Sequence, residues 1–145
     1  MYKHLLIACD GSDLSQKALE QGVALAKAIG AKITILNVTL PWTSVAVGES
    51  GVALPPERYD SMAAEGAALI LEKAAEVAKN AGLSCDTVHM ESRAPWEGII
   101  QTAQEREADL IVMSSHGRSG IARLLLGSQA NDVVRHSTIP VLICR

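Results

Sequence analysis

Two stretches of the sequence place small and polar residues directly after apolar runs, where a folded chain can hold a ligand. The first is CDGSDLS near the N-terminus, and the second is SSHGRSGIARLLLGS, from Ser114 to Ser128. Clustered glycines favour a backbone that turns tightly or approaches a ligand closely. Gly127 and Ser128 would seat phosphate oxygens, because a helix start presents free N–H groups and partial positive charge. Gly117 and Gly120 would turn loop amides toward the same anion.

Single residues in these stretches also have structural interpretations. Asp10 either belongs to a ligand site or caps the following helix or turn. Ser128 is compatible with both a helix cap and a phosphate seat. His116 has no obvious nucleophile or orienting acid nearby in the sequence, which favours a loop-positioning role over catalysis.

Familiar catalytic and nucleotide motifs are missing from the sequence. There is no Gly-x-x-x-x-Gly-Lys-Ser/Thr phosphate loop, no Gly-x-Gly-x-x-Gly after the first apolar run and no Gly-x-Ser-x-Gly nucleophile elbow. No His/Cys cluster has the spacing of metal ligands. Cys9, Cys85 and Cys144 are widely separated, which is typical of small core residues in a reducing compartment.

The composition is that of one globular domain. The chain has 145 residues, of which 48% are hydrophobic and 20% are charged, and it is long enough to bury a core of its own. A net charge of −3, with two Trp, two Tyr and no Phe, argues against a nucleic-acid partner. We see neither a signal peptide nor a membrane span, so we expect a cytoplasmic protein without a membrane partner.

Short apolar runs alternate with helical patterns along the chain. The expected strands are 4–9, 32–38, 84–91, 109–114 and 140–144. The expected helices are 14–29 with Ser12 or Ser15 as the cap, 64–78, one from Pro95, and one after Gly127 with Ala130, Val133 and Val134 facing inward. This alternation predicts an α/β fold: a single doubly wound, Rossmann-like domain over 1–145, with a five-stranded parallel sheet and helices on both faces.

The predicted topology brings the two glycine-containing stretches to one edge of the sheet. In a doubly wound sheet the ligand crevice lies beyond the carboxyl ends of the strands, where the winding reverses. We therefore expect the loops after the first and fourth strands to be neighbours. The segment Thr39–Asp60 fits neither periodicity, and both a functional lid and a surface insertion are consistent with it.

The sequence resembles the universal stress protein family over the whole chain, from LLIACDGSDLSQKAL to PVLICR. Nucleotide-binding members of that family carry Gly, two residues, Gly, nine residues, then Gly-Ser or Gly-Thr. The corresponding positions here are Ser114, Gly117, Gly127 and Ser128. The resemblance implies an ATP-binding regulatory protein, commonly a homodimer joined through its last strand, here Val141–Cys144. Serine replaces the first glycine, and we expect its side chain to crowd the sugar.

The same resemblance assigns residues to each part of the nucleotide. Asp10 would hold the nucleoside, the backbone of Val38 would contact adenine, and Met113 would end the fourth strand against the sugar. The loop glycines and the amide of Gln129 would surround the phosphates. The expected nucleotide-binding residues are Ala8, Cys9, Asp10, Val38, Met113, Ser114, His116, Gly117, Arg118, Gly127, Ser128 and Gln129.

We therefore expect a stress-response protein in which ATP, with or without Mg2+, biases the conformation of a homodimer or its choice of a regulatory protein partner. A nucleotide-independent dimeric interaction protein of the same family is the alternative. An enzyme using Asp10 as general base is the third hypothesis and the least favoured, because no substrate-specific set of residues accompanies Asp10. Fast phosphoryl transfer needs a positioned base, metal carboxylates and a cationic clamp. Near the loop only Arg118 and Arg123 offer positive charge, so any ATP hydrolysis should be slow.

Overall fold

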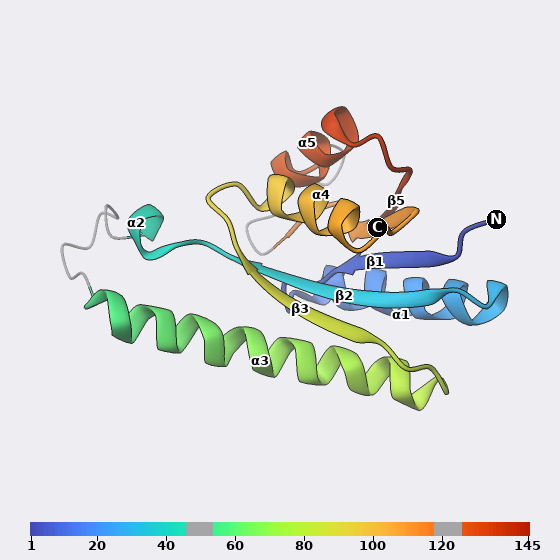
Figure 1. Ribbon diagram of the computed structural model, residues 1–145, viewed down its shortest axis with the longest axis horizontal. Helices are drawn as coiled ribbons and strands as arrows, with labels where there is room; N and C mark the ends of the chain where they lie inside the picture. The colour runs from blue at the N-terminus through green and yellow to red at the C-terminus, as the bar shows by residue number, and fades with distance from the viewer. Residues whose placement is uncertain (46–53, 118–125) are drawn as a thin grey trace.

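A five-stranded, all-parallel sheet organises the residues that the structure, a computed structural model, describes: 1–45, 54–117 and 126–145 (Figure 1). Its strands are β1 (His4–Ala8), β2 (Lys32–Thr39), β3 (Asp86–Glu91), β4 (Leu110–Ser114) and β5 (Val141–Cys144). The strand order is β3-β2-β1-β4-β5, so the winding reverses between β1 and β4. Each predicted strand is confirmed to within two residues at either end, and the α/β fold class is confirmed.

Helices cover both faces of this sheet. The helices of the described residues are α1 (Asp13–Ile29), α2 (Trp42–Val45), α3 (Pro56–Asn80), α4 (Pro95–Glu105) and α5 (Ser128–His136), of which α2 buries no residue. Helices α1 and α3 lie on one face, and α4 and α5 lie on the other (Figure 1). As predicted, Ser12 caps α1, its hydroxyl accepting a hydrogen bond from the Ser15 N–H at 3.2 Å.

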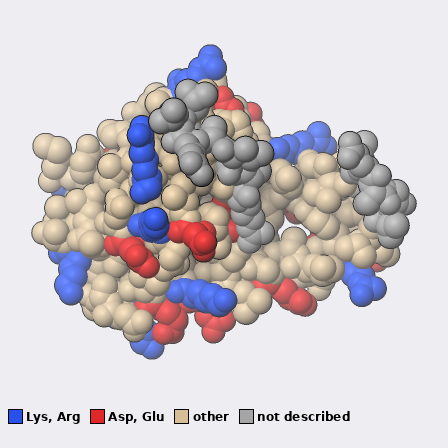
Figure 2. All heavy atoms as spheres, turned by 180° about the vertical axis from the view of Figure 1, so that it is seen from behind, with Lys and Arg blue, Asp and Glu red and all other residues tan. Residues whose placement is uncertain are grey.

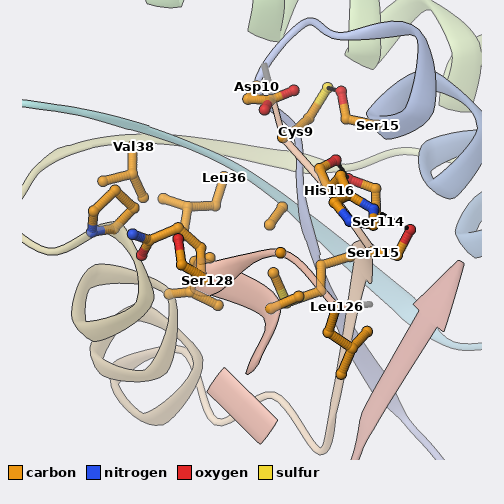
Figure 3. A pocket seen from close by; sticks show the side chains of 18 residues that line it. Cys9, Asp10, Ser15, Leu36, Val38, Ser114, Ser115, His116, Leu126 and Ser128 are labelled. Atoms are coloured by element: carbon orange, nitrogen blue, oxygen red, sulfur yellow. Dashed lines mark hydrogen bonds between the residues drawn. The ribbon is translucent and has the colours of Figure 1, made fainter. Parts of the chain in front are cut away.

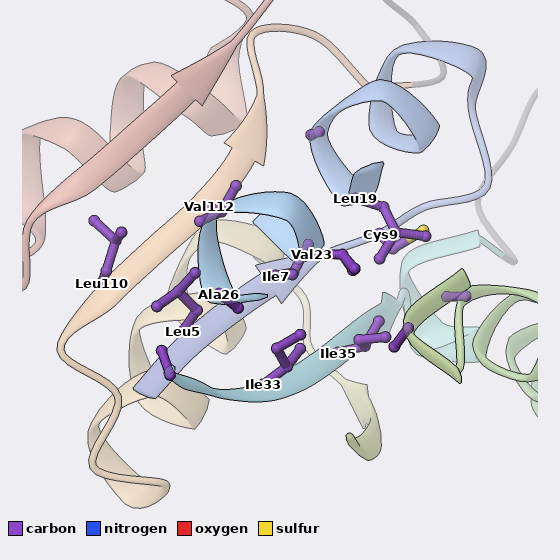
Figure 4. Close-up of a cluster of buried hydrophobic side chains, with 14 of the residues drawn as sticks. Leu5, Ile7, Cys9, Leu19, Val23, Ala26, Ile33, Ile35, Leu110 and Val112 are labelled. Carbon is purple, nitrogen blue, oxygen red and sulfur yellow. The ribbon is translucent and has the colours of Figure 1, made fainter. Parts of the chain in front are cut away.

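Alternate residues of each inner strand enter two separate cores. Leu5 and Ile7 of β1 pack with Ile35 of β2 beneath α1 and α3, as Figure 4 shows for the first core. Leu6 and Leu36 point the other way, into the core under α4 and α5. Because both faces of these strands are buried, their sequences read as continuous apolar runs rather than alternating ones.

Asp109 ties the start of β1 to the start of β4. Its Oδ1 accepts a hydrogen bond from the His4 N–H at 2.9 Å, and its Oδ2 accepts one from the Lys3 N–H at 2.9 Å. Burial by itself would raise the pKa of the Asp109 carboxyl, but these backbone hydrogen bonds and the nearby His4 outweigh it and lower the pKa.

Helix α3 begins eight residues before the predicted 64–78 pattern, so part of Thr39–Asp60 is helical. Its first turns extend past the sheet (Figure 1), where no core demands an apolar stripe. Two hydrogen bonds of 2.7 Å connect the start of α3 and the residue range before it to the segment after β2. They run from Tyr59 Oη to the Leu40 carbonyl and from Trp42 Nε1 to the Leu54 carbonyl. Residues 46–53 lie outside the described part of the chain, so the choice between a lid and an insertion stays open.

Helix α5 buries a narrower stripe than the sequence predicts. Ala130 and Val133 are buried as expected, whereas Val134 is 45% exposed and its predicted inward orientation is wrong. The physical reason is position: α5 packs beside β5, the last strand of the sheet, and no further strand in the described structure lies beyond it to cover Val134.

On one face of the molecule the charged side chains of the described residues mix both signs. Figure 2 shows basic and acidic groups lying beside one another on the face seen from behind. This arrangement produces short-range alternation of potential on that face rather than one broad field. In the described ranges, no helix combines the length and apolarity needed to cross a membrane.

Candidate functional site

A cavity of about 390 Å3 opens at the carboxyl ends of β1, β2 and β4, where the winding reverses. Every expected nucleotide-binding residue that the structure describes lines it: Ala8, Cys9, Asp10, Val38, Met113, Ser114, His116, Gly117, Gly127, Ser128 and Gln129. Arg118 lies outside the described residues. The predicted meeting of the loops after the first and fourth strands is thereby confirmed, while the binding roles of these residues stay predictions.

One side of the cavity is apolar. Leu36 and Val38 of β2 line it (Figure 3), and Pro95 and Ile99 of α4 lie among the remaining apolar lining residues. The sequence predicts Val38 in the site and Pro95 as a helix start, but it gives no sign that Pro95 and the buried Ile99 line the cavity. The missing signal was spatial: α4 begins at the same sheet edge, so its first turn serves both the core and the cavity.

The other side is polar and is built where the two loops touch. Asp10 Oδ1 accepts a hydrogen bond from the Ser12 N–H at 2.9 Å, which fixes the carboxyl at the end of β1. A Cβ at Gly117 would lie 2.7 Å from Asp10 Oδ2, so the β4 loop passes directly against this carboxyl. A side chain at 117 would have to displace Asp10.

Hydrogen bonds within the β4 loop hold its first turn. The Ser114 hydroxyl donates to the His116 carbonyl at 2.8 Å, and the Gly127 N–H donates to the Ser115 carbonyl at 2.8 Å. His116 Nδ1 lies 3.1 Å from Ser115 Oγ, a contact consistent with the loop-positioning role expected for this histidine. The Ser114 hydroxyl is therefore engaged with the loop itself, so the hydroxymethyl group has an intramolecular role besides any contact with a ligand.

Three of the described helices start around this cavity, and they differ in how their first amides are satisfied. Helix α1 is capped by the Ser12 side chain, and the Trp96 N–H of α4 donates to Gln129 Oε1 at 2.9 Å. Among the described residues no side chain caps helix α5, and Gly127 rather than Ser128 is its N-cap residue.

The uncapped start of α5 leaves backbone donors at the cavity. Its first intrahelical bond runs from the Asn131 N–H to the Gly127 carbonyl at 2.9 Å. The amides of residues 128 to 130 precede that bond, and these three residues line the cavity. A row of amides at the positive end of a helix dipole is suited to binding an anion.

The described lining residues are suited to binding a ligand that is apolar at one end and anionic at the other. Asp10 is the one acidic side chain among the described lining residues. Nor do the described ranges contain a group of three or more His, Cys, Asp or Glu side chains placed to hold a metal ion.

Known proteins match this chain from end to end. Residues 1–145 match the universal stress protein family. Universal stress protein YxiE of Bacillus subtilis is 36% identical over 150 aligned positions, which cover all of both chains. Universal stress protein MJ0531 of Methanocaldococcus jannaschii is 30% identical over 145 positions, covering 100% of this chain and 83% of the relative.

Solved structures agree with these sequence matches. The hypothetical protein MJ0577 superposes with a TM-score of 0.83 at 25% identity, covering 99% of this chain and 96% of the other. A universal stress protein in complex with cAMP superposes with a TM-score of 0.75 at 29% identity, covering 99% and 97%. The shared parallel sheet, the full-length match and the relatives' identities together show that this chain belongs to the universal stress protein family.

Proposed function

We propose that the protein binds ATP in the cavity between β1 and β4, and that occupancy biases the assembly of a homodimer or its binding of a regulatory protein. The observation that carries this proposal is the uncapped start of α5, which faces a cavity whose opposite side is apolar. A nucleotide has the same division between a flat base and anionic phosphates. The cAMP complex of a relative with 29% identity supports a nucleotide as the ligand class.

The backbone of Val38 favours adenine over guanine. The Leu36 carbonyl accepts a hydrogen bond from the Cys9 N–H at 2.8 Å, so the backbone polar groups of Leu36 face β1. Alternate residues of a parallel strand face the same neighbour, so the N–H and C=O of Val38 point past the end of β1, toward the cavity that Val38 lines. Adenine offers an acceptor beside an amino donor, which complements this pair, whereas guanine offers the reverse polarity.

The phosphates would lie against the start of α5. The amides of Ser128 and Gln129 supply donors there, and the absence of a side chain at Gly127 keeps the turn close to the helix. Mg2+ would be held mainly by phosphate oxygens, because Asp10 is the single carboxylate in the described lining. This donor set suits binding better than rapid phosphoryl transfer, so we expect slow hydrolysis at most.

The homodimer would form through β5. This strand ends the sheet, with Val141 and Ile143 half-buried and Leu142 38% exposed. An apolar edge with unpaired backbone groups is suited to pairing with another strand, and a second copy of the chain supplies the same surface. In the chain, β5 follows α5 directly, so a nucleotide that orders the start of α5 acts one element away from the proposed interface.

Titration of nucleotide-stripped protein tests the proposal. Isothermal titration calorimetry should give an ATP dissociation constant of about 1 mM or tighter, with GTP binding at least about tenfold more weakly. Light scattering with and without ATP then reports whether the nucleotide changes assembly. A dimer that binds neither nucleotide would contradict the proposal and support the nucleotide-independent interaction protein.

A further inference from the structure

Asn37 is a buried polar residue that the proposed site does not yet explain. It is 3% exposed, and it lies on β2 on the same side as the apolar residues Ile33 and Ile35. Its Nδ2 donates to the Cys9 carbonyl at 2.8 Å, while its Oδ1 is buried without a hydrogen-bond partner in the described structure. Burying an unpaired amide oxygen is unfavourable, so core packing alone does not account for this residue.

The position of Asn37 coincides with the point where β1 and β2 stop pairing. Ala8 lies opposite Leu36, so continuing the register would place Cys9 opposite Asn37. The Cys9 N–H already donates to the Leu36 carbonyl at 2.8 Å. In a continuing parallel ladder, the Cys9 carbonyl would accept the next bond from the Val38 N–H. The Asn37 side chain donates to that carbonyl instead.

We infer that Asn37 is a positioning residue that ends the β1–β2 ladder one bond early and thereby keeps the Val38 N–H available to the base. The inference rests on the proposed function, because the base is adenine only if the cavity binds ATP. Val38 itself lines the cavity, whereas Asn37 acts from beneath it, through the Cys9 carbonyl. The unfavourable burial of one amide oxygen is then explained by a recognition role.

Replacing the amide tests this role. In Asn37→Leu the Cys9 carbonyl loses its side-chain donor, and the register offers it the Val38 N–H. The ladder should therefore lengthen, and adenosine should bind about tenfold more weakly. Inorganic tripolyphosphate, which lacks the base, should bind as it does to the wild type. Asn37→Val, with a β-branched residue suited to a strand, is a second variant that removes the same donor.

Thr34→Val is the matched control for loss of a buried hydrogen bond. Thr34 is fully buried on the same strand, and its Oγ1 lies 2.8 Å from His4 Nε2, outside the cavity lining. This variant should lose stability without losing adenosine affinity. Equal loss of affinity in the Asn37 and Thr34 variants would reduce Asn37 to a structural role and overturn the inference.

Amide hydrogen exchange measured by NMR gives a readout that needs no ligand. In the nucleotide-free wild type, the Val38 amide should exchange faster than the Leu36 amide, and Asn37→Leu should slow it. Adenosine should slow Val38 exchange in the wild type. If Val38 is already protected without nucleotide to the same degree in both proteins, the inference is wrong. Failure of the wild type to bind adenosine would instead overturn the proposed function, and the exchange comparison would still decide the role of Asn37.

Discussion

Valine at Gly127 would probe the phosphate seat at its most crowded point. A Cβ at this position would lie 3.0 Å from the Ser115 carbonyl oxygen and 3.4 Å from His116 Cα. Both contacts are to backbone, which cannot swing aside as the end of a side chain can. The backbone angles of Gly127, φ −60° and ψ 159°, suit any residue, so the effect of the change arises from contact rather than from conformational strain.

The expected losses of stability and ATP affinity follow from the contacts that the turn at Gly127 would lose. The Gly127 N–H donates to the Ser115 carbonyl at 2.8 Å, a bond of about 1 kcal/mol that the added side chain would stretch. Overpacking two further methyl groups costs about 1–3 kcal/mol, which we expect as the loss in free energy of unfolding. Displacing the α5 amides from the phosphates removes hydrogen bonds to a charged group, each about 1.5–3 kcal/mol, so ATP affinity should fall by about a hundredfold.

The assay pairs calorimetric titration of ATP with urea unfolding followed by circular dichroism. Gly66→Val is the matched control, because a Cβ at Gly66 in α3 meets nothing within 4 Å. The control should retain wild-type affinity for ATP. Unchanged ATP affinity in a folded Gly127→Val variant would place the phosphates elsewhere and refute the reasoning.

Further outcomes follow from the β4 loop, the sheet edge and the strand starts. Ser114→Gly removes the hydrogen bond from the serine hydroxyl to the His116 carbonyl, so ATP should bind about threefold more weakly in calorimetry. Tighter binding would instead support the expectation from the sequence that the serine side chain crowds the sugar. Val141→Asp places a charge on the proposed β5 interface and should yield monomer by light scattering at concentrations where the wild type is dimeric, and a monomeric wild type at high micromolar concentration would contradict the interface. Asp109 has a lowered pKa in the folded state, so it stabilises the fold above the unfolded carboxyl pKa of about 3.9, and this contribution is lost as the pH falls through the folded value. The difference in unfolding free energy between wild type and Asp109→Asn should therefore shrink from pH 7 to pH 3. A constant difference would argue against a stabilising role of the ionised Asp109 carboxylate.

The sheet was predictable because burial on both faces leaves a local signature. Runs such as KITILNV need no partner sequence to be recognised as inner strands. The first turns of α3 were missed for the opposite reason, since they extend past the sheet (Figure 1) and the helix has no buried residue before Ala67. Pro56 at the helix start was the available signal, because proline is favoured in the first turn.

The lining of the candidate site was predictable where the family pattern lies within one loop, and less so where the lining depends on contacts across the sheet. The Gly127-Ser128 pair is visible in the sequence, although the structure makes Gly127 the cap residue. Asn37 is different: its meaning depends on the Cys9 carbonyl opposite, which no periodicity reveals. Likewise, the hydrogen bond from the Trp96 N–H to the Gln129 side chain forms only because the starts of α4 and α5 are neighbours in space.

The central place of β1 has a consequence for the order in which the protein can be completed during synthesis. β2 follows β1 closely in the sequence, but the other neighbour of β1, β4, lies about 105 residues further along the chain. At about 5–20 residues per second, that edge of β1 waits about 5–20 s for its partner. The cavity draws its lining from both parts, so it is incomplete until β4 and α5 emerge. Under the proposed function, cellular ATP would prolong the lifetime of finished molecules without guiding their assembly on the ribosome.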